Sequence, residues 1–136
     1  MEAKVLTPSD RQMAADMLST HYTGSAGKFP VDFLPETGVA VVDDGKTICV
    51  IPVYLESTSS VAVLGHFIAA HGVSPKKLHR AAALAIEAAK RFARAAGKKY
   101  VVAIFGRRSI NKIADTMGFT TTDHFEEKFC YIGGGF

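Results

Sequence analysis

The chain has 136 residues, of which 48% are hydrophobic and 21% are charged, so it suits one globular domain and not a disordered chain. No apolar run approaches the roughly 20 residues that cross a bilayer. The start, MEAKVLTPSD, lacks the basic and apolar parts of a signal peptide, so we expect a cytoplasmic protein with no membrane partner.

The first predicted elements are a short strand and a helix. The strand includes Val5 and the residue after it. Thr7 is suited to cap the N-terminus of a helix, and Pro8 fits the first helical position. Apolar residues then recur at helical spacing, so we expect this helix to end near His21.

A loop and three strand-like segments follow. Residues 23–37 carry Gly and Pro and predict a loop, whose apolar residues are suited to cover a groove. Residues 38–42 and 46–54 are rich in β-branched residues and flank an Asp-Asp-Gly turn, so they predict a β-hairpin. Residues 61–70 form a third apolar run, which we expect to be one strand buried on both faces.

The next segments predict a parallel strand pair joined by a helix. Ser74 and Pro75 open a helix with an alanine-rich apolar stripe, and Gly97 is suited to end it. Residues 100–105, YVVAIF, form a short apolar strand. Because a helix connects this strand to the run at 61–70, we expect the two strands to be parallel.

A short helix over 109–117 and closing strands over 119–124 and 126–132 complete the predicted order. Residues 1–136 therefore predict a single α/β domain (α+β, mixed sheet). We expect a central sheet of about six to seven strands with helices on both faces.

Two local motifs stand out on this framework. Val73-Ser74-Pro75 leads into LHRAAA at 78–83, and IADTMGF at 113–119 ends the second helix. With the order of elements over nearly the whole chain, these motifs resemble the GNAT N-acetyltransferase superfamily. The resemblance implies a GNAT-like acyl-CoA N-acyltransferase fold that uses acetyl-CoA. In that family a Gln/Arg-x-x-Gly-x-Gly/Ala loop opens the helix, and its backbone amides hold the pyrophosphate.

The sequence departs from this family motif at two positions. Leu78 stands where Gln or Arg is usual, and Ala81 replaces the first Gly, which adds a methyl where backbone approaches phosphate. The charges of His79 and Arg80 are suited to compensate. The resemblance places the acetyl-CoA contacts at His71, Val73, Lys77, His79, Arg80, Ala81 and Ala83.

The family's catalytic residues are only partly matched. Many members use a Glu on the central strands as base and a Tyr in the later helix as acid, but residues 61–70 hold no acid and the Tyr position falls near Ala114. We therefore expect His66 or His71 to be the base, because a histidine titrates near neutral pH. Tyr54 and Glu56 are weaker candidates, and a purely structural role is the alternative for a lone strand histidine.

The charge distribution supports an anionic ligand. The net charge is +3, but residues 76–112 hold eleven Lys or Arg and one acid, Glu87. Such an asymmetry favours phosphates, a nucleotide-like cofactor or nucleic acid, and the alternative is a solvated helix face. No aromatic residues are placed for stacking bases, so nucleic acid is the least favoured of these partners.

Three functions follow from these observations. The first is an N-acetyltransferase whose acceptor is a small-molecule or protein amine. The second is a catalytically degenerate GNAT-like structural or interaction protein, similar to some encoded among bacteriophage structural genes, with a homo-oligomer or virion partner and a virion-associated location. The third is a basic nucleic-acid-binding domain. The spacing of the histidines and of Cys49 and Cys130 matches no metal site or disulfide framework.

Overall fold

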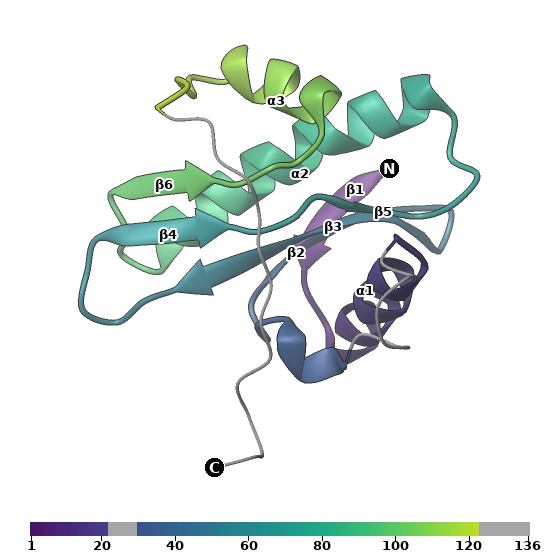
Figure 1. Cartoon of the computed structure of the whole chain (residues 1–136), viewed down its shortest axis with the longest axis horizontal. Helices are drawn as coiled ribbons and strands as arrows, with labels where there is room; N and C mark the ends of the chain where they lie inside the picture. The colour runs from purple at the N-terminus through teal and green to yellow at the C-terminus, as the bar shows by residue number, and fades with distance from the viewer. Residues whose placement is uncertain (22–29, 123–136) are drawn as a thin grey trace.

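The computed structural model describes residues 1–21 and 30–122 (Figure 1). Within them the elements are β1 (Glu2–Val5), α1 (Pro8–His21), the 3-10 turn η1 (Val31–Phe33), β2 (Gly38–Asp43), β3 (Lys46–Leu55), β4 (Val61–Leu64), β5 (Ile68–Ala69), α2 (Pro75–Ala95), β6 (Tyr100–Ala103) and α3 (Arg108–Asp115). None of these helices is long and apolar enough to cross a membrane.

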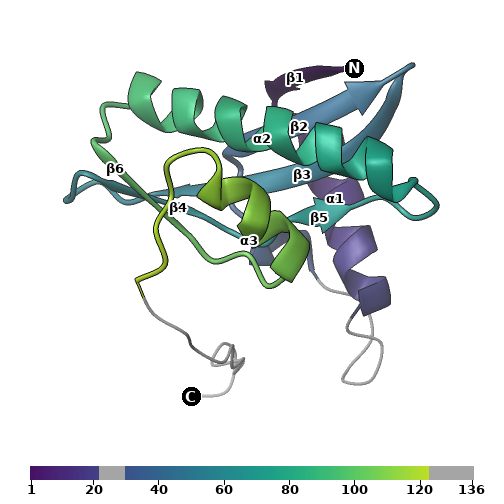
Figure 2. The same ribbon diagram turned by 90° about the horizontal axis from the view of Figure 1, so that it is seen from above.

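The strands form one mixed sheet, as predicted. Its order is β1-β2-β3-β4-β6, with β5 also paired to β3. Every pair is antiparallel except β4 with β6, which confirms the predicted parallel pair. Helices α2 and α3 cover one face of the sheet and α1 covers the other (Figures 1 and 2).

Helix α1 begins where the sequence predicts, because Thr7 and Asp10 cap it reciprocally. The amide of Asp10 donates to Thr7 Oγ1 at 3.2 Å, and the amide of Thr7 donates to Asp10 Oδ2 at 3.0 Å. Lys4 Nζ lies 2.9 Å from the same carboxylate. Burial raises the pKa of Asp10, but the hydrogen bonds from Lys4 and Thr7 outweigh it and leave the pKa below its ordinary value.

The predicted hairpin is confirmed as β2 and β3. Asp44 and Gly45 form its two-residue turn with φ of 52° and 75°. Positive φ at both central positions matches the right-handed twist of the strands, and the Asp-Gly pair adopts it at low cost. The turn brings Asp43 to the end of the sheet where α2 begins, as its ion pair with Lys77 shows.

The single strand predicted over 61–70 is wrong. Leu64 and Ile68 are four positions apart in the sequence, whereas their partners on β3, Val53 and Val50, are three positions apart. One extra residue is therefore accommodated between the two segments, and β4 and β5 are separated by a bulge at 65–67.

The predicted caps of α2 are also present. Ser74 is its N-cap, and Gly97 follows it with φ of 84°, a conformation that glycine adopts readily. Alanines on the buried stripe, among them Ala81, Ala85 and Ala89, have essentially no exposed surface. Their small size lets the helix lie close to the sheet.

Helix α3 is confirmed, but the segment after it is irregular. The amide of Phe119 donates to Ala114 O at 3.2 Å, and Gly118 has a φ of 92°. This turn holds the chain against the end of α3, so the predicted strand over 119–124 is absent from its described part, 119–122. The rest of that strand and the one predicted over 126–132 lie outside the described residues.

Cys49 is buried on β3, and it is the described cysteine of the two. Burial raises its pKa to about 12, so the thiol is neutral and unreactive. Cys130 lies outside the described residues. Among the residues that the structure describes, no group of His, Cys, Asp and Glu is arranged to hold a metal ion.

Candidate functional site

The parallel strands β4 and β6 separate at one end, and we call the space between their continuations the fork. The amide of Ile104 donates to Leu64 O at 3.1 Å, which is the bond after the Leu64–Ala103 pair. Beyond it, one arm (65–70) stays with β3 through β5, while the other arm (104–107) leads into α3 (Figure 2). The fork therefore opens toward the end of the sheet from which α2 starts.

One arm of the fork directs backbone groups away from β3 and into the fork. The amide of Ala70 donates to Ile48 O at 2.9 Å, so Ala70 and Ile68 direct their backbone groups toward β3. Backbone groups alternate in direction along a strand, so the N–H and C=O of Ala69 are directed into the fork. Ala69 is buried, and no backbone partner for its amide is present among residues 1–21 and 30–122. A buried amide of this kind normally has a partner.

The vertex of the fork is the bulge between β4 and β5. The amide of Gly65 donates to Pro52 O at 2.8 Å. A Cβ on Gly65 would lie 2.9 Å from Cε2 of Tyr54, so the tyrosine ring lies against this glycine. His66 follows directly and is half-buried. Two side chains that can exchange protons, Tyr54 and His66, are thus placed at the vertex.

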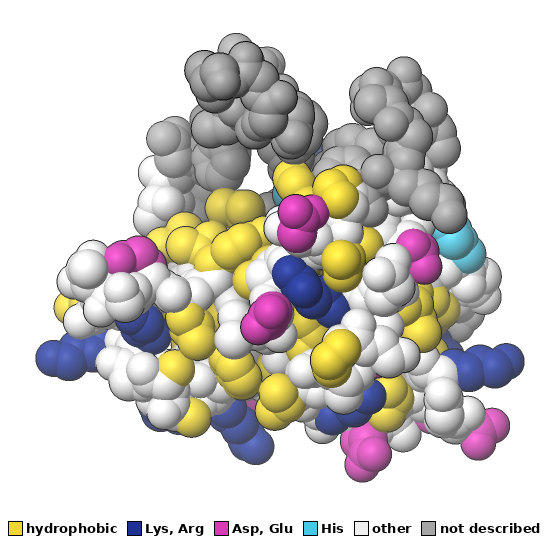
Figure 3. All heavy atoms as spheres, turned by 90° about the horizontal axis from the view of Figure 1, so that it is seen from below, with side chains coloured by type: hydrophobic (Ala, Val, Ile, Leu, Met, Phe, Trp, Pro, Cys, Tyr) yellow, Lys and Arg dark blue, Asp and Glu magenta, His cyan; other side chains and the backbone are white. Residues whose placement is uncertain are grey.

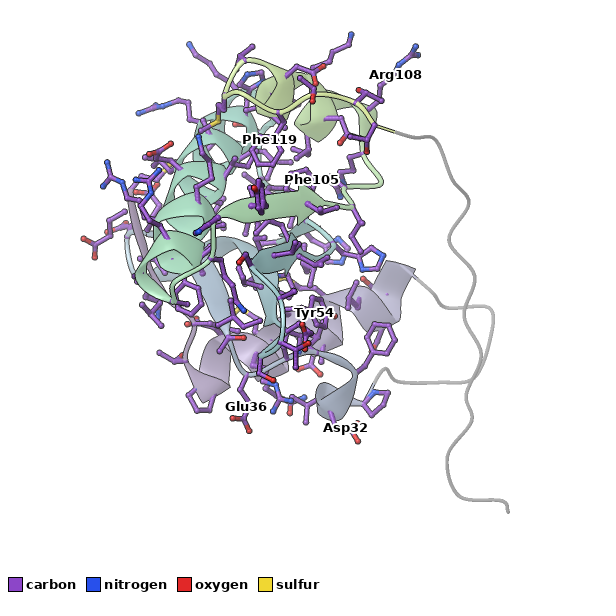
Figure 4. The ribbon with its side chains drawn as sticks, turned by 90° about the vertical axis from the view of Figure 1, so that its left-hand side faces the viewer. Asp32, Glu36, Tyr54, Phe105, Arg108 and Phe119 are labelled. Carbon is purple, nitrogen blue, oxygen red and sulfur yellow. The ribbon has the colours of Figure 1, made fainter. Side chains whose placement is uncertain are left out.

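The sheet face at the vertex is only partly covered by α1. Tyr100 and Val102 on β6 are 64% and 46% exposed, and they lie on the face opposite to Val101, which packs under α2. Figure 3 shows the molecule from below, and hydrophobic side chains lie between charged ones on this side. In Figure 4, Tyr54 is drawn between Phe105 and the acidic side chains of Asp32 and Glu36.

The start of α2 differs from the loop that the family motif implies. The helix begins at Pro75, and residues 78–83 lie within it, so the amides of His79 and Ala81 are directed along the helix axis into its own bonds. The amide of Leu78 donates to Ser74 O at 2.9 Å, and that of Lys77 donates to Ser74 Oγ at 3.3 Å. Only the Lys76 amide in this first turn has no partner among the described residues.

The small residues of the motif lie on the inner side of α2. Ala81 has no exposed surface, and Ala83 is half-buried and packs beside the core. Their backbone therefore does not form an open cradle for phosphate. The signal for this in the sequence is the absence of glycine at 78–83, because alanine continues a helix where glycine would interrupt it.

The predicted cationic side chains have different partners. Lys77 Nζ lies 2.7 Å from Asp43 Oδ2, and the same carboxylate also pairs with the N-terminal amine. Hydrogen bonds from Lys77 and from the N-terminus lower the pKa of Asp43. In contrast, His79 and Arg80 are exposed and make no ion pair within the described part of the chain. These two side chains remain available to an anion.

The two candidate bases lie at different ends of the same arm. His66 is at the vertex, and His71 follows β5 at the open end, where its Nε2 lies 2.8 Å from Thr20 Oγ1 of α1. Val73 is half-buried and packs on the core below α2. The structure therefore separates His66 from His71 by the length of β5.

The other acid and base candidates lie away from the fork. Ala114, at the family's Tyr position, is buried on α3. Glu56 accepts hydrogen bonds from the side chain and the amide of Thr58 at 2.5 and 2.8 Å, and these bonds lower its pKa. Glu56 is thus engaged in the turn after β3. Tyr54, by contrast, lies at the vertex of the fork, and its contact with Gly65 depends on a bulge that the sequence does not reveal.

A cavity of about 900 Å³ lies beside β6 and α3, and Phe105, Arg108 and Phe119 are among its lining residues (Figure 4). The sequence-predicted site residues are not part of its lining. Asn111 Nδ2 donates to Phe105 O at 2.8 Å and fixes the second arm of the fork against α3. The cavity adjoins the fork, because Ile104, Phe105 and Gly106 of the second arm also line it.

The sequence matches no protein-family model and no curated protein. Solved structures do match over almost the whole chain. A ribosomal-protein-alanine N-acetyltransferase from Brucella melitensis biovar Abortus is 15% identical with a TM-score of 0.66, and the match covers 96% of this chain and 98% of that one.

Aminoglycoside acetyltransferases match similarly. AAC(6')-Iy, in complex with a CoA-containing bisubstrate analogue, is 14% identical with a TM-score of 0.63, over 95% of this chain and 98% of that one. An enzyme from an uncultured soil metagenomic sample, in complex with sisomicin, is 10% identical with a TM-score of 0.63, over 96% and 95%. The chain therefore has the GNAT acetyltransferase fold, which confirms the fold prediction.

Proposed function

We propose that this chain, which has the GNAT acetyltransferase fold, binds acetyl-CoA at the fork and transfers its acetyl group to an amine. The observation that carries the proposal is the buried backbone of Ala69, which is directed into the fork and has no backbone partner there among residues 1–21 and 30–122. An extended amide-containing arm, such as the pantetheine of CoA, can pair with such a strand edge.

The residues around the open end fit this cofactor in part. The backbone at His71 and Val73 continues the arm beyond β5, and the exposed side chains of His79 and Arg80 supply positive charge for phosphates. The helical backbone at Ala81 and Ala83 does not fit an amide cradle, and Lys77 is already paired with Asp43. Phosphate binding here would therefore depend on side-chain charge and be sensitive to salt.

The vertex supplies the proton chemistry. When bound, acetyl-CoA supplies a thioester carbonyl, at which a C–N bond to the amine forms while the C–S bond breaks and the thiolate leaves. In this proposal His66, which follows the vertex glycine, accepts the proton that the attacking amine loses, directly or through a water molecule. His71 is the less suitable base, because it lies beside Thr20 at the open end of the arm, away from the vertex.

The acceptor approaches from the sheet face beside α1. That face carries exposed apolar residues on β6 and the acids Asp32 and Glu36 near η1 (Figures 3 and 4). It suits an amine on a small molecule or on a protein. Structural relatives act on amines of both kinds, since their names specify an aminoglycoside and a ribosomal-protein alanine.

Isothermal titration with acetyl-CoA tests the proposal. Arg80→Ala should weaken binding, whereas Arg94→Ala should not, because Arg94 is an equally exposed arginine at the opposite end of α2. Transfer is then followed by mass spectrometry with a panel of amines and with His66→Ala. The absence of heat at millimolar acetyl-CoA, from a chain shown to be folded, would refute the proposal.

A second candidate function is a non-catalytic GNAT-fold module for assembly or interaction. The observation that favours it is the start of α2, where regular helix from Pro75 replaces the phosphate-binding loop. Light scattering and a CoA titration on the same sample distinguish the two functions. A defined oligomer without CoA binding supports the module, and CoA binding by the chain contradicts it.

A further inference from the structure

Tyr54 occupies the space on one side of the fork vertex. It stands opposite Val63 on β4, and its Cε2 is 2.9 Å from the position of a Cβ on Gly65, two residues further along. Cβ and O of Pro52 are each 3.5 Å from the same position. Any side chain at position 65 would therefore compete with the tyrosine ring. The absence of a side chain at Gly65 is what allows the ring to lie against the vertex.

The ring lies on the face of the sheet that α1 covers further along. Val50 of β3 packs in the core under α1, whereas Ile51 and Val53 pack in the core under α2. Because side chains alternate along a strand, Pro52 and Tyr54 share the α1 face with Val50. Tyr54 thus closes the vertex from the face on which the acceptor would approach.

The vertex is the closed end of the fork, and this position determines which part of a bound ligand would contact it. This step rests on the proposed function. A CoA thioester with its phosphates at His79 and Arg80 enters at the open end of the fork, and its arm runs along Ala69. The acyl group is at the far end of that arm, so it reaches the vertex at Gly65 and Tyr54.

We propose that the Tyr54 ring limits the length of the acyl group that this site accepts, with Gly65 making room for the ring. Tyr54 is then a specificity-determining residue, and the bulk of its ring matters more than its hydroxyl. A pocket closed by a side chain discriminates against each added methylene by roughly tenfold or more. The chain should therefore prefer acetyl-CoA to propionyl-CoA and butyryl-CoA.

The test compares the affinities of acetyl-, propionyl- and butyryl-CoA by isothermal titration for four proteins. These are the unchanged chain, Tyr54→Ala, Tyr54→Phe and the control Tyr100→Ala, which removes an exposed tyrosine from β6 on the same sheet face. Circular dichroism checks that each is folded. If Tyr54→Ala does not fold, Tyr54→Leu takes its place, because leucine is a larger apolar side chain than alanine but is shorter than the ring.

The expected result is that affinity falls with acyl length for the unchanged chain, for Tyr54→Phe and for Tyr100→Ala. For Tyr54→Ala or Tyr54→Leu, butyryl-CoA should bind as tightly as acetyl-CoA. Equal binding of all three thioesters by the unchanged chain overturns the inference but leaves the proposed function intact. Unchanged discrimination in Tyr54→Ala and Tyr54→Leu, or lost discrimination in Tyr54→Phe, also overturns it. Failure of every thioester to bind the unchanged chain refutes the proposed function and this inference with it.

Discussion

Replacing Gly65 by alanine adds one carbon atom, Cβ, at the vertex of the fork. The new Cβ would lie 2.9 Å from the Tyr54 ring, about 0.5 Å inside the 3.4 Å at which ordinary contact begins. Pro52 Cβ and Pro52 O, both at 3.5 Å, limit movement of the new methyl away from the ring. Overpacking of a buried site costs about 1–3 kcal/mol, so we expect Gly65→Ala to lower the free energy of unfolding by that amount.

Combining Gly65→Ala with Tyr54→Ala isolates the contact between the new methyl group and the tyrosine ring. Without the ring the clash is removed, and the remaining effect is the smaller entropy of the unfolded chain, which favours alanine by about 0.4–1 kcal/mol. Urea unfolding of the two single variants and the double variant measures the coupling between them. Gly106→Ala is the matched control, because a Cβ at Gly106 meets no atom within 4 Å. Equal stabilities of Gly65→Ala and Gly106→Ala would refute the reasoning.

Three further outcomes are expected. Asp10→Asn should lower the free energy of unfolding by about 1 kcal/mol at pH 7, the scale of a lost helix cap. The folded pKa of Asp10 lies below its ordinary value of 3.8, so its contribution to stability is present above that value and is lost as the pH falls through the folded pKa. The free energy of unfolding of the variant should therefore change less with pH in this acidic range. Cys49 should resist a thiol reagent at pH 8 in the folded chain and react in urea, since burial raises its pKa to about 12; reaction at equal rates in both states would contradict this. Lys77→Ala should leave acetyl-CoA affinity unchanged by titration calorimetry, because Lys77 is paired with Asp43, and a loss as large as that of Arg80→Ala would show that the pairing is exchanged for phosphate.

The elements that the sequence predicted well are those fixed by local chemistry. Thr7 and Asp10 cap α1, and Asp44-Gly45 supplies the positive φ of the hairpin turn. Ser74 and Gly97 mark the two ends of α2. Each of these signals acts within a few residues, so it can be recognised without knowledge of the fold.

The site was less predictable because its geometry depends on distant residues. The bulge at 65–67 arises from the register of 61–69 against β3, and it brings Tyr54 onto Gly65. The ion pair that engages Lys77 joins residues 34 positions apart, Asp43 and Lys77. Helix at 78–83 is predicted by the cap at Ser74 and Pro75 and by alanine in place of glycine, and the structure confirms it, although the family motif implies a loop there.

Both proposals require the strand edge at Ala69 to bind the arm of CoA. Amide hydrogen exchange, measured with and without CoA on the full chain, examines this edge residue by residue. CoA should slow exchange of the Ala69 amide, while the amide of Ala70, already bonded to Ile48, should exchange at an unchanged rate. If the Ala69 amide exchanges equally fast at saturating CoA and in its absence, the arm of CoA does not bind this strand edge.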